Sequence, residues 1–388
     1  MSFQSRKTPL FSWHRNRQAR MVSFAGWCLP LRYDGSLAEA RAVRDSCGIF
    51  DVSHMGHLSI RGSDAPRFLQ RMTSNDVEAL AEGRLQYTLF LSSEGTVLDD
   101  CILGSLSEEY LCVVNAVNRQ KILHRLRAAI EDEDVSVADQ TEERAFISVQ
   151  GPASAAVVEK AVPAARELEY MSVSRTRWGD HSLTLLRSGY TGELGFEISL
   201  PAAAALRLWE LLCASGEECG MRACGLGARD ILRIEAGYPL YGQEIDENTR
   251  PFAAGVGWAV KMGKADFIGR SALAGERAQP GSVVRTGIVL ERAKIARTGY
   301  PVYAAGRQVG TVTSGTFSPA LQKSIAMVRI ESGYAQAGQR VVTMIRGQAA
   351  DSVVTDLPFV PIHTKQKGIP CESGCCPKPR REGPGARC

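Results

Sequence analysis

The clearest hydrophobic pattern in the chain lies between residues 85 and 103. Two β-prone runs, 87–91 and 96–103, are separated by Ser, Glu and Gly at positions 92–95, which predicts a hairpin with a four-residue loop. Because side chains alternate between the two faces of a strand, Asp99 and Asp100 point to opposite faces. Whichever face is buried therefore carries a carboxylate. This loop length pairs Leu91 with Thr96 and places Tyr87 directly opposite Asp100.

Periodicity and capping signals extend this pattern along the chain. They predict a helix from residue 63 and further helices over residues 37–45, 118–131, 153–162 and 202–213. Strands are predicted over residues 57–61, 110–115, 145–150, 182–187 and 194–200. Strands and helices intermix without strict alternation, which favours an α+β fold with antiparallel sheets. Five short β runs follow residue 281 and predict a small all-β barrel or sandwich, over residues 283–290, 301–304, 308–313, 325–330 and 340–344.

Length and charge narrow the class of protein. The 388 residues are 44% hydrophobic, enough for a large core divided into two or three domains. No apolar run reaches the ~18 residues of a membrane span and no signal peptide is visible, so we expect a cytoplasmic protein without a membrane partner. The net charge of +4 comes from residues 362–388, where six Lys and Arg face two Glu. The neutral remainder argues against nucleic-acid binding.

The same C-terminal segment is distinct in composition. It holds four of the eleven cysteines and many Pro and Gly residues, and we expect residues 362–388 to form a disordered, basic, Cys-rich tail. Its cysteines form no C-x-x-C pair with a second knuckle, and the other seven are scattered without paired spacing. We therefore expect no metal site and a reducing compartment.

Two further segments combine turn residues with charge. Residues 189–197 hold three Gly and two Glu, and Glu197 is either an exposed hairpin residue or a carboxylate that accepts two N–H donors from a heterocycle such as an aminopyrimidinone. Arg229 and Arg233 lie one helical turn apart, and an Arg near the start of this helix can clamp a ligand carboxylate. Taken alone, structural partners are the simpler interpretation for these arginines and for Asp100.

Ordered short motifs from residue 8 to residue 361 resemble one family, the aminomethyltransferase (T-protein) of the glycine cleavage system. The motifs that carry the resemblance are Phe24-Ala25-Gly26-Trp27, Phe50-Asp51-Val52-Ser53-His54-Met55, Leu98-Asp99-Asp100, Tyr190-Thr191-Gly192-Glu193, Gly227-Ala228-Arg229-Asp230, Tyr241-Gly242-Gln243, Asp246-Glu247-Asn248-Thr249, Thr313-Ser314-Gly315, Phe317-Ser318-Pro319 and Pro358-Phe359-Val360-Pro361.

The resemblance implies a three-lobed cloverleaf around a central channel. Residues 8–270 would form a folate-binding module of two subdomains, and residues 282–361 a C-terminal β-barrel domain. The expected activity transfers the methylene carbon of an aminomethyl-lipoyl arm on the H-protein to tetrahydrofolate, as co-substrate, with release of ammonia. Glycine decarboxylase and dihydrolipoamide dehydrogenase are the implied further members of the system.

The resemblance also assigns residues. Asp100 is the implied catalytic residue, which hydrogen-bonds N10 and orients the folate for attack. Glu197 is the implied pterin ligand and Arg229 a folate-binding residue. By the same alignment, four more residues are implied to line the pocket: Met55, Tyr87, Tyr190 and, through its backbone, Val114.

Some positions depart from the family pattern. Leu194 stands where the family usually has Asp, and Cys101 replaces a more usual Leu. The family often has an aromatic or basic residue just after Pro361 that contacts the folate tail; here Ile-His-Thr-Lys stands at 362–365, and the residue that makes this contact is left open. Two alternatives remain: a folate-dependent demethylase, and a non-enzymatic folate-binding protein of iron-sulfur maintenance. The second is disfavoured, because residues 237–244 keep the frame of its signature without the Cys. Folate modules of dimethylglycine and sarcosine oxidising enzymes are attached to a flavin domain that this chain lacks.

Overall fold

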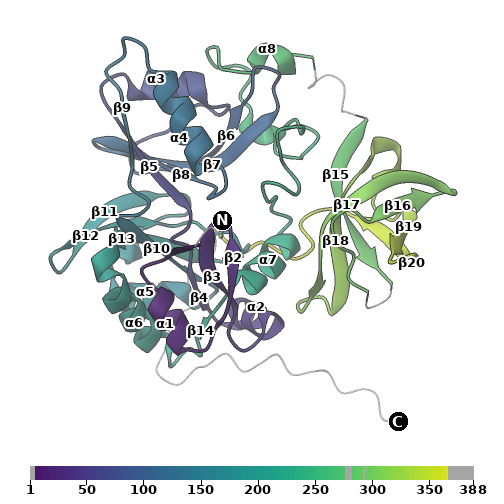
Figure 1. Cartoon of the computed structure of the whole chain (residues 1–388), viewed down its shortest axis with the longest axis horizontal. Coiled ribbons are helices and arrows are strands. Elements are labelled where there is room, and N and C mark those ends of the chain that lie inside the picture. Colours follow the sequence, from purple (N-terminus) through teal and green to yellow (C-terminus); the bar gives the residue numbers. More distant parts are fainter. Residues whose placement is uncertain (1–4, 276–281, 292–293, 366–388) are drawn as a thin grey trace.

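The computed structural model describes residues 5–275, 282–291 and 294–365, which form three lobes (Figure 1). The α+β class is confirmed. The first lobe contains a three-stranded sheet, a six-stranded sheet and the helices around them: β1 (Arg6–Lys7), α1 (Phe11–Asn16), β2 (Arg20–Phe24), β3 (Trp27–Arg32), α2 (Ser36–Asp45), β4 (Gly48–Asp51), β10 (Arg144–Gln150), α5 (Ser154–Ala161), β11 (Val173–Trp178), β12 (His181–Leu186), β13 (Gly195–Pro201), α6 (Ala205–Gly216), β14 (Arg222–Ala223) and α7 (Leu226–Glu235).

The large sheet of the first lobe has the strand order β11-β12-β13-β10-β4-β14. Helix α6 buries Ala205, Leu208, Trp209 and Leu212, which recur at helical spacing and so form one apolar stripe. This stripe packs with α5 against the apolar face of β10 and β13. The opposite face of the sheet is turned toward the other lobes. Glu197 on β13 lies on this face and lines the cavity there.

The second lobe is a five-stranded sheet of order β6-β7-β8-β5-β9. Its elements are β5 (Gly56–Arg61), α3 (Ala65–Met72), β6 (Leu85–Leu91), β7 (Val97–Leu106), β8 (Glu109–Val114), α4 (Arg119–Ala128) and β9 (Ser136–Asp139). Phe68 of α3 and Ile122 of α4 are fully buried in a common core with the sheet. Burial alternates along the start of β7, as the sequence pattern predicts.

The predicted register of the β6–β7 hairpin is wrong by two residues. Leu91 pairs with Val97, not Thr96, and a bulge follows, so Leu89 lies opposite Asp100 and Tyr87 lies opposite Ile102. The loop is one residue longer than expected and the bulge adds another. An even shift keeps every side chain on its face. Tyr87 therefore still shares a face with Asp100, as its diagonal neighbour, and the two side chains touch.

The third lobe is a closed barrel of order β15-β18-β17-β16-β19-β20, which confirms the predicted C-terminal barrel. Its strands are β15 (Val283–Leu290), β16 (Pro301–Ala304), β17 (Arg307–Ser318), β18 (Lys323–Glu331), β19 (Arg340–Ile345) and β20 (Gln348–Thr355). Strand β20, which the sequence pattern did not predict, pairs with β19 and β15 and closes the barrel. No edge strand is then left open.

The lobes are joined by α7 and by the segment that follows it. Ile234 of α7 packs against Ile325 and Met327 of the barrel. Residues 236–275 then cross to the second lobe, where α8 (Arg270–Leu273) buries Leu273 beside the β6–β7 hairpin. From residue 366 onward, the predicted tail lies outside the described residues.

Candidate active site

Asp99 and Asp100 occupy different environments on β7. The side chain of Asp99 is fully buried and accepts hydrogen bonds from Asn118 Nδ2 at 2.6 Å and Asn115 Nδ2 at 2.8 Å. Burial and the neighbouring Asp100 charge raise the pKa of Asp99 to about 8. Asp99 therefore fixes the loop after β8.

Asp100 faces the space between the lobes. Its Oδ2 accepts a hydrogen bond from Tyr87 Oη at 3.0 Å, and its Oδ1 accepts one from Asn115 Nδ2 at 2.7 Å. Burial raises the pKa of Asp100, while these two hydrogen bonds favour its charged form. The ring of Tyr87 stacks on Trp258, with 5.1 Å between centroids. The carboxylate is thus held in one orientation by groups from β6 and from the loop after β8.

Glu197, Arg229 and Tyr190 lie together on the first lobe. Glu197 Oε2 accepts a hydrogen bond from Ser188 Oγ at 2.6 Å. The Arg229 guanidinium lies over the Tyr190 ring, 4.7 Å from its centroid, and makes no hydrogen bond or ion pair with the described residues. Burial raises the pKa of Glu197 and lowers the pKa of Arg229. Both charged groups are therefore partly desolvated, and each keeps bonding capacity for a ligand.

One cavity of about 860 Å³ brings these residues together. Asp100, Tyr87, Met55, Tyr190, Glu197 and Arg229 all line it. Val114 does not: its side chain is buried in the core of the second lobe, while its neighbours Val113 and Asn115 line the cavity. All three lobes contribute to the wall, because Arg285 and Ser314 of the barrel also face it.

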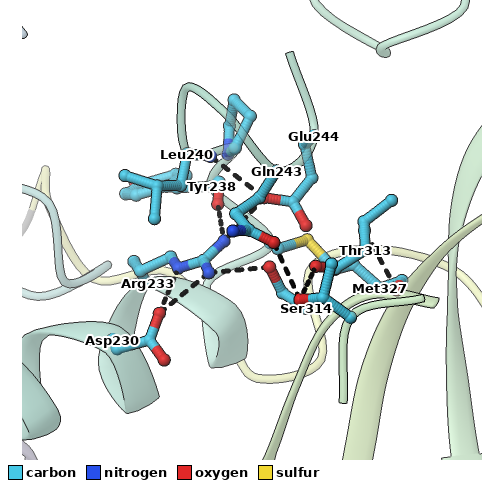
Figure 2. Close-up of polar contacts among 12 residues, drawn as sticks. Asp230, Arg233, Tyr238, Leu240, Gln243, Glu244, Thr313, Ser314 and Met327 are labelled. Carbon is cyan, nitrogen blue, oxygen red and sulfur yellow. Dashed lines mark hydrogen bonds and ion pairs between the residues drawn. The ribbon is translucent and has the colours of Figure 1, made fainter. Parts of the chain in front are cut away.

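The two arginines of α7 differ in what they bind. Figure 2 shows that Arg233 reaches both Glu244 and the barrel residue Ser314: Nη1 lies 2.7 Å from Glu244 Oε2, and Nη2 lies 2.8 Å from Ser314 Oγ. Arg233 Nε donates to Asp230 Oδ1 at 2.9 Å. Burial alone would lower the pKa of Arg233, but Glu244, Tyr190 and Asp230 together raise it. Arg233 is therefore the structural ion-pair residue, and Arg229, one turn earlier, is left facing the cavity.

Several residues of this cavity were not predicted from the sequence. His54 is buried, with Nδ1 unpartnered, and burial together with Arg229 lowers its pKa to about 3, so the imidazole is neutral. Asn115, which bridges both aspartates, and Trp258 were also missed. His54 lies within the motif Phe50-Asp51-Val52-Ser53-His54-Met55, so the sequence carried a signal for it. Asn115 and Trp258 gave no signal, because their role depends on tertiary contacts.

The cavity fits a folate-sized heterocycle. Its volume lies within the usual range for small-molecule sites, of about 300–1,000 Å³. Glu197 Oε1 makes no hydrogen bond with the described residues, and its carboxylate can accept N–H donors from an aminopyrimidinone. Among the described residues no group of three or more His, Cys, Asp or Glu could hold a metal ion. Within the same residues no helix is long and apolar enough to cross a membrane.

Comparisons with known proteins agree with this geometry. The GCVT N-terminal domain model matches residues 10–264, and the model of the glycine cleavage T-protein C-terminal barrel domain matches residues 284–361. The chain is 41% identical to an aminomethyltransferase of Chlorobium limicola, over 92% of this chain and 99% of the relative. It is also 41% identical to one of Symbiobacterium thermophilum, over 92% and 98%.

A solved structure extends the likeness to three dimensions. The crystal structure of glycine cleavage system aminomethyltransferase T from Bartonella henselae superposes with a TM-score of 0.88 at 32% identity. The match covers 94% of this chain and all of the Bartonella chain. The chain therefore belongs to the aminomethyltransferase (T-protein) family of the glycine cleavage system.

Proposed function

We propose that this enzyme transfers the methylene carbon of an aminomethyl-lipoyl arm, carried by the glycine cleavage H-protein, to tetrahydrofolate. The products are 5,10-methylenetetrahydrofolate, ammonia and the reduced lipoyl arm. The observation that carries this proposal is the convergence of Asp100, Glu197 and Arg229 on one cavity between three lobes. Glycine decarboxylase and dihydrolipoamide dehydrogenase are the proposed further partners.

In this proposal Glu197 and Arg229 hold the heterocycle and Asp100 acts at the reacting nitrogens. Glu197 accepts N–H donors of the pterin, and Tyr190 and Arg229 offer a flat surface and a positive charge beside it. Met55 adds apolar wall, and Val114 is proposed to contribute through its backbone. The amide of Asn115 and the hydroxyl of Tyr87 donate hydrogen bonds that keep the Asp100 carboxylate oriented for proton transfer at N10.

Ammonia release from aminomethylated H-protein, with and without tetrahydrofolate, tests this proposal. We expect release to depend on the enzyme and to accelerate strongly when tetrahydrofolate is present, with an equal amount of methylenetetrahydrofolate formed. Methylated thiol and ether donors in place of the H-protein serve as the comparison. Folate methylation from those donors, without ammonia release from H-protein, would instead support a demethylase. Folate binding without either reaction would support a non-enzymatic role.

A further inference from the structure

Arg285 is a charged residue of the cavity that the family resemblance does not assign a role. It lies on β15 and reaches from the barrel into the space between the lobes. Its Nη1 donates to Gly237 O at 2.7 Å and lies 3.4 Å from Met327 Sδ. Its Nε is buried without a partner, and Nη2 makes no hydrogen bond with any residue that the structure describes. An unsatisfied buried donor costs about 1–3 kcal/mol, so the Nε–H group, with Nη2 beside it, is available to a ligand.

The neighbours of Arg285 place it beside the reacting centre. The titratable and charged groups that act on it are Glu244, Tyr87, Tyr190 and Arg233. Packing also places Arg285 near Tyr87: its guanidinium lies against Gly255, and Trp258, three residues later, stacks on Tyr87, which donates to Asp100. Glu244 makes no hydrogen bond or ion pair with Arg285: its Oε2 is bound by Arg233 at 2.7 Å, and its Oε1 has no partner among the described residues.

The loop beside Arg285 has a glycine, Gly255, where a side chain would press against the guanidinium. Gly255 has a φ of +71°, in the left-handed region that glycine favours, and a Cβ built there would lie 3.3 Å from Arg285 Nη2 and 3.5 Å from Nε. Gly255 and Arg285 both line the cavity. A positive group with free donors therefore stands in a largely desolvated site, where its interaction with a developing negative charge is strong.

We propose that Arg285 is a catalytic residue that stabilises the sulfur anion of the lipoyl arm as the carbon–sulfur bond breaks. The proposal rests on the proposed function. In that reaction the carbon–nitrogen bond breaks and the nitrogen leaves as ammonia. The carbon–sulfur bond also breaks, with its electron pair going to sulfur, and the carbon ends bonded to two folate nitrogens. Those nitrogens release two protons, one taken up by the departing amine and one by the thiolate.

Chemistry favours the thiolate over a folate carboxylate as the ligand of Arg285. Among the steps of the reaction, carbon–sulfur cleavage is the one that places a new negative charge near Asp100. Arg229, beside Glu197, already provides an unpaired cation at the predicted heterocycle end of the cavity. A guanidinium that donates to sulfur lowers the pKa of the thiol by favouring its charged form.

The test measures the reverse reaction, in which reduced lipoyl H-protein, ammonia and methylenetetrahydrofolate give aminomethylated H-protein. Rates are recorded against pH for wild type, Arg285→Met and Arg285→Lys. We expect Arg285→Met to lower the rate at neutral pH by about 10²-fold and to move the alkaline rise of the profile up by about one pH unit or more. Arg285→Lys should restore part of both effects. Tetrahydrofolate affinity should change by less than about threefold.

Arg329→Met is the matched control. Arg329 is the cross-strand neighbour of Arg285, and it binds Glu244 O and Thr249 Oγ1 without lining the cavity. This variant should lose stability and keep the wild-type pH profile. An unchanged profile in Arg285→Met, an equal shift in Arg329→Met, or a loss of folate affinity as the main effect would overturn the assignment. If the wild-type enzyme shows no aminomethyl transfer in either direction, the proposed function itself fails. That outcome is distinct from the three outcomes that overturn only the role of Arg285.

Discussion

Asp99 and Asp100 are adjacent in the sequence and yet serve different purposes, because a strand turns them to opposite faces. Asp99 is enclosed by Asn115 and Asn118, whereas Asp100 reaches the cavity. The alternation that separates them was predictable from the sequence. Helices α3 and α4 pack on one face of the sheet and so decide which face is the core and which lines the cavity. The residues around Asp99 and Asp100 in the sequence do not contain that information.

The pKa of Asp99 predicts a pH dependence of stability. Its folded pKa of about 8 lies above the unfolded value of 3.8, so the folded protein binds more protons in that window. The contribution of Asp99 is fully present below pH 4 and is lost as pH rises toward 8, at up to about 1.4 kcal/mol per pH unit. Asp99→Asn should flatten this decline in urea unfolding between pH 5 and pH 8. The exposed Asp351→Asn should keep the wild-type slope, and parallel curves for Asp99→Asn would refute the assignment.

Glu197 gives a second prediction at the residue scale. Glu197→Gln keeps the shape of the side chain and removes the charge, so tetrahydrofolate affinity should fall by about 10- to 100-fold, as for the loss of a charge-assisted hydrogen bond. Turnover at saturating folate should fall much less. Equilibrium binding and steady-state kinetics measure the two quantities. Glu210→Gln on the exposed face of α6 should match wild type, and unaltered binding by Glu197→Gln would remove Glu197 from the pterin site.

At the scale of elements, α7 fastens the barrel to the first lobe. Arg233 reaches Ser314 of β17, and two residues later Glu235 accepts hydrogen bonds from Ser318 Oγ and Ala320 N. Arg44 of α2 forms an ion pair with the other carboxylate oxygen of Glu235. Each charge is buried with partners, which is the condition under which a buried ion is tolerated.

Arg229 and Arg233 allow a matched comparison on this helix. Arg233→Met leaves Glu244 buried without its partner and should cost about 3–5 kcal/mol of unfolding free energy. Arg229→Met breaks no ion pair with the described residues, so it should keep most of the stability and weaken folate binding. Chemical unfolding and folate titration of both variants measure the difference. Equal loss of stability in the two variants would contradict the separate roles.

The hairpin and the barrel show what sequence patterns predict at this scale. The contact between Tyr87 and Asp100 was predicted, but through a wrong register, and it survives because the bulge shifts the pairing by an even number. Strand β20 was missed because it begins Gln348-Ala349-Ala350-Asp351, residues with low β-propensity. It is a strand because it pairs with both β15 and β19. Long-range pairing of this kind carries no local signature.

At the scale of the whole molecule, the cavity exists only where three lobes meet. Residues as far apart as Met55 and Arg285 line it, and spacing alone could not join them. The resemblance to a family supplied that connection. It did not distinguish Val114, whose side chain faces a core, from its neighbours on the cavity wall, because adjacent strand residues face opposite ways.

A ligand in this cavity should stabilise the molecule as a unit. Tetrahydrofolate at 100 times its dissociation constant should raise the unfolding free energy by about 2.7 kcal/mol. Because all three lobes form the wall, slowed amide hydrogen exchange should include β7, β13 and β15. Exchange measured by mass spectrometry with and without ligand checks this expectation. Protection confined to one lobe would contradict a shared site.

The measurement that tests the central claim most directly compares Asp100→Asn with wild type in methylenetetrahydrofolate formation from aminomethylated H-protein. Asn keeps the volume and removes the charge that Tyr87 and Asn115 orient. We predict a loss of turnover of roughly two to four orders of magnitude, with folate affinity changed far less, and a mild effect of Asp99→Asn. Equal turnover in wild type and Asp100→Asn, or a greater loss in Asp99→Asn, would contradict the account.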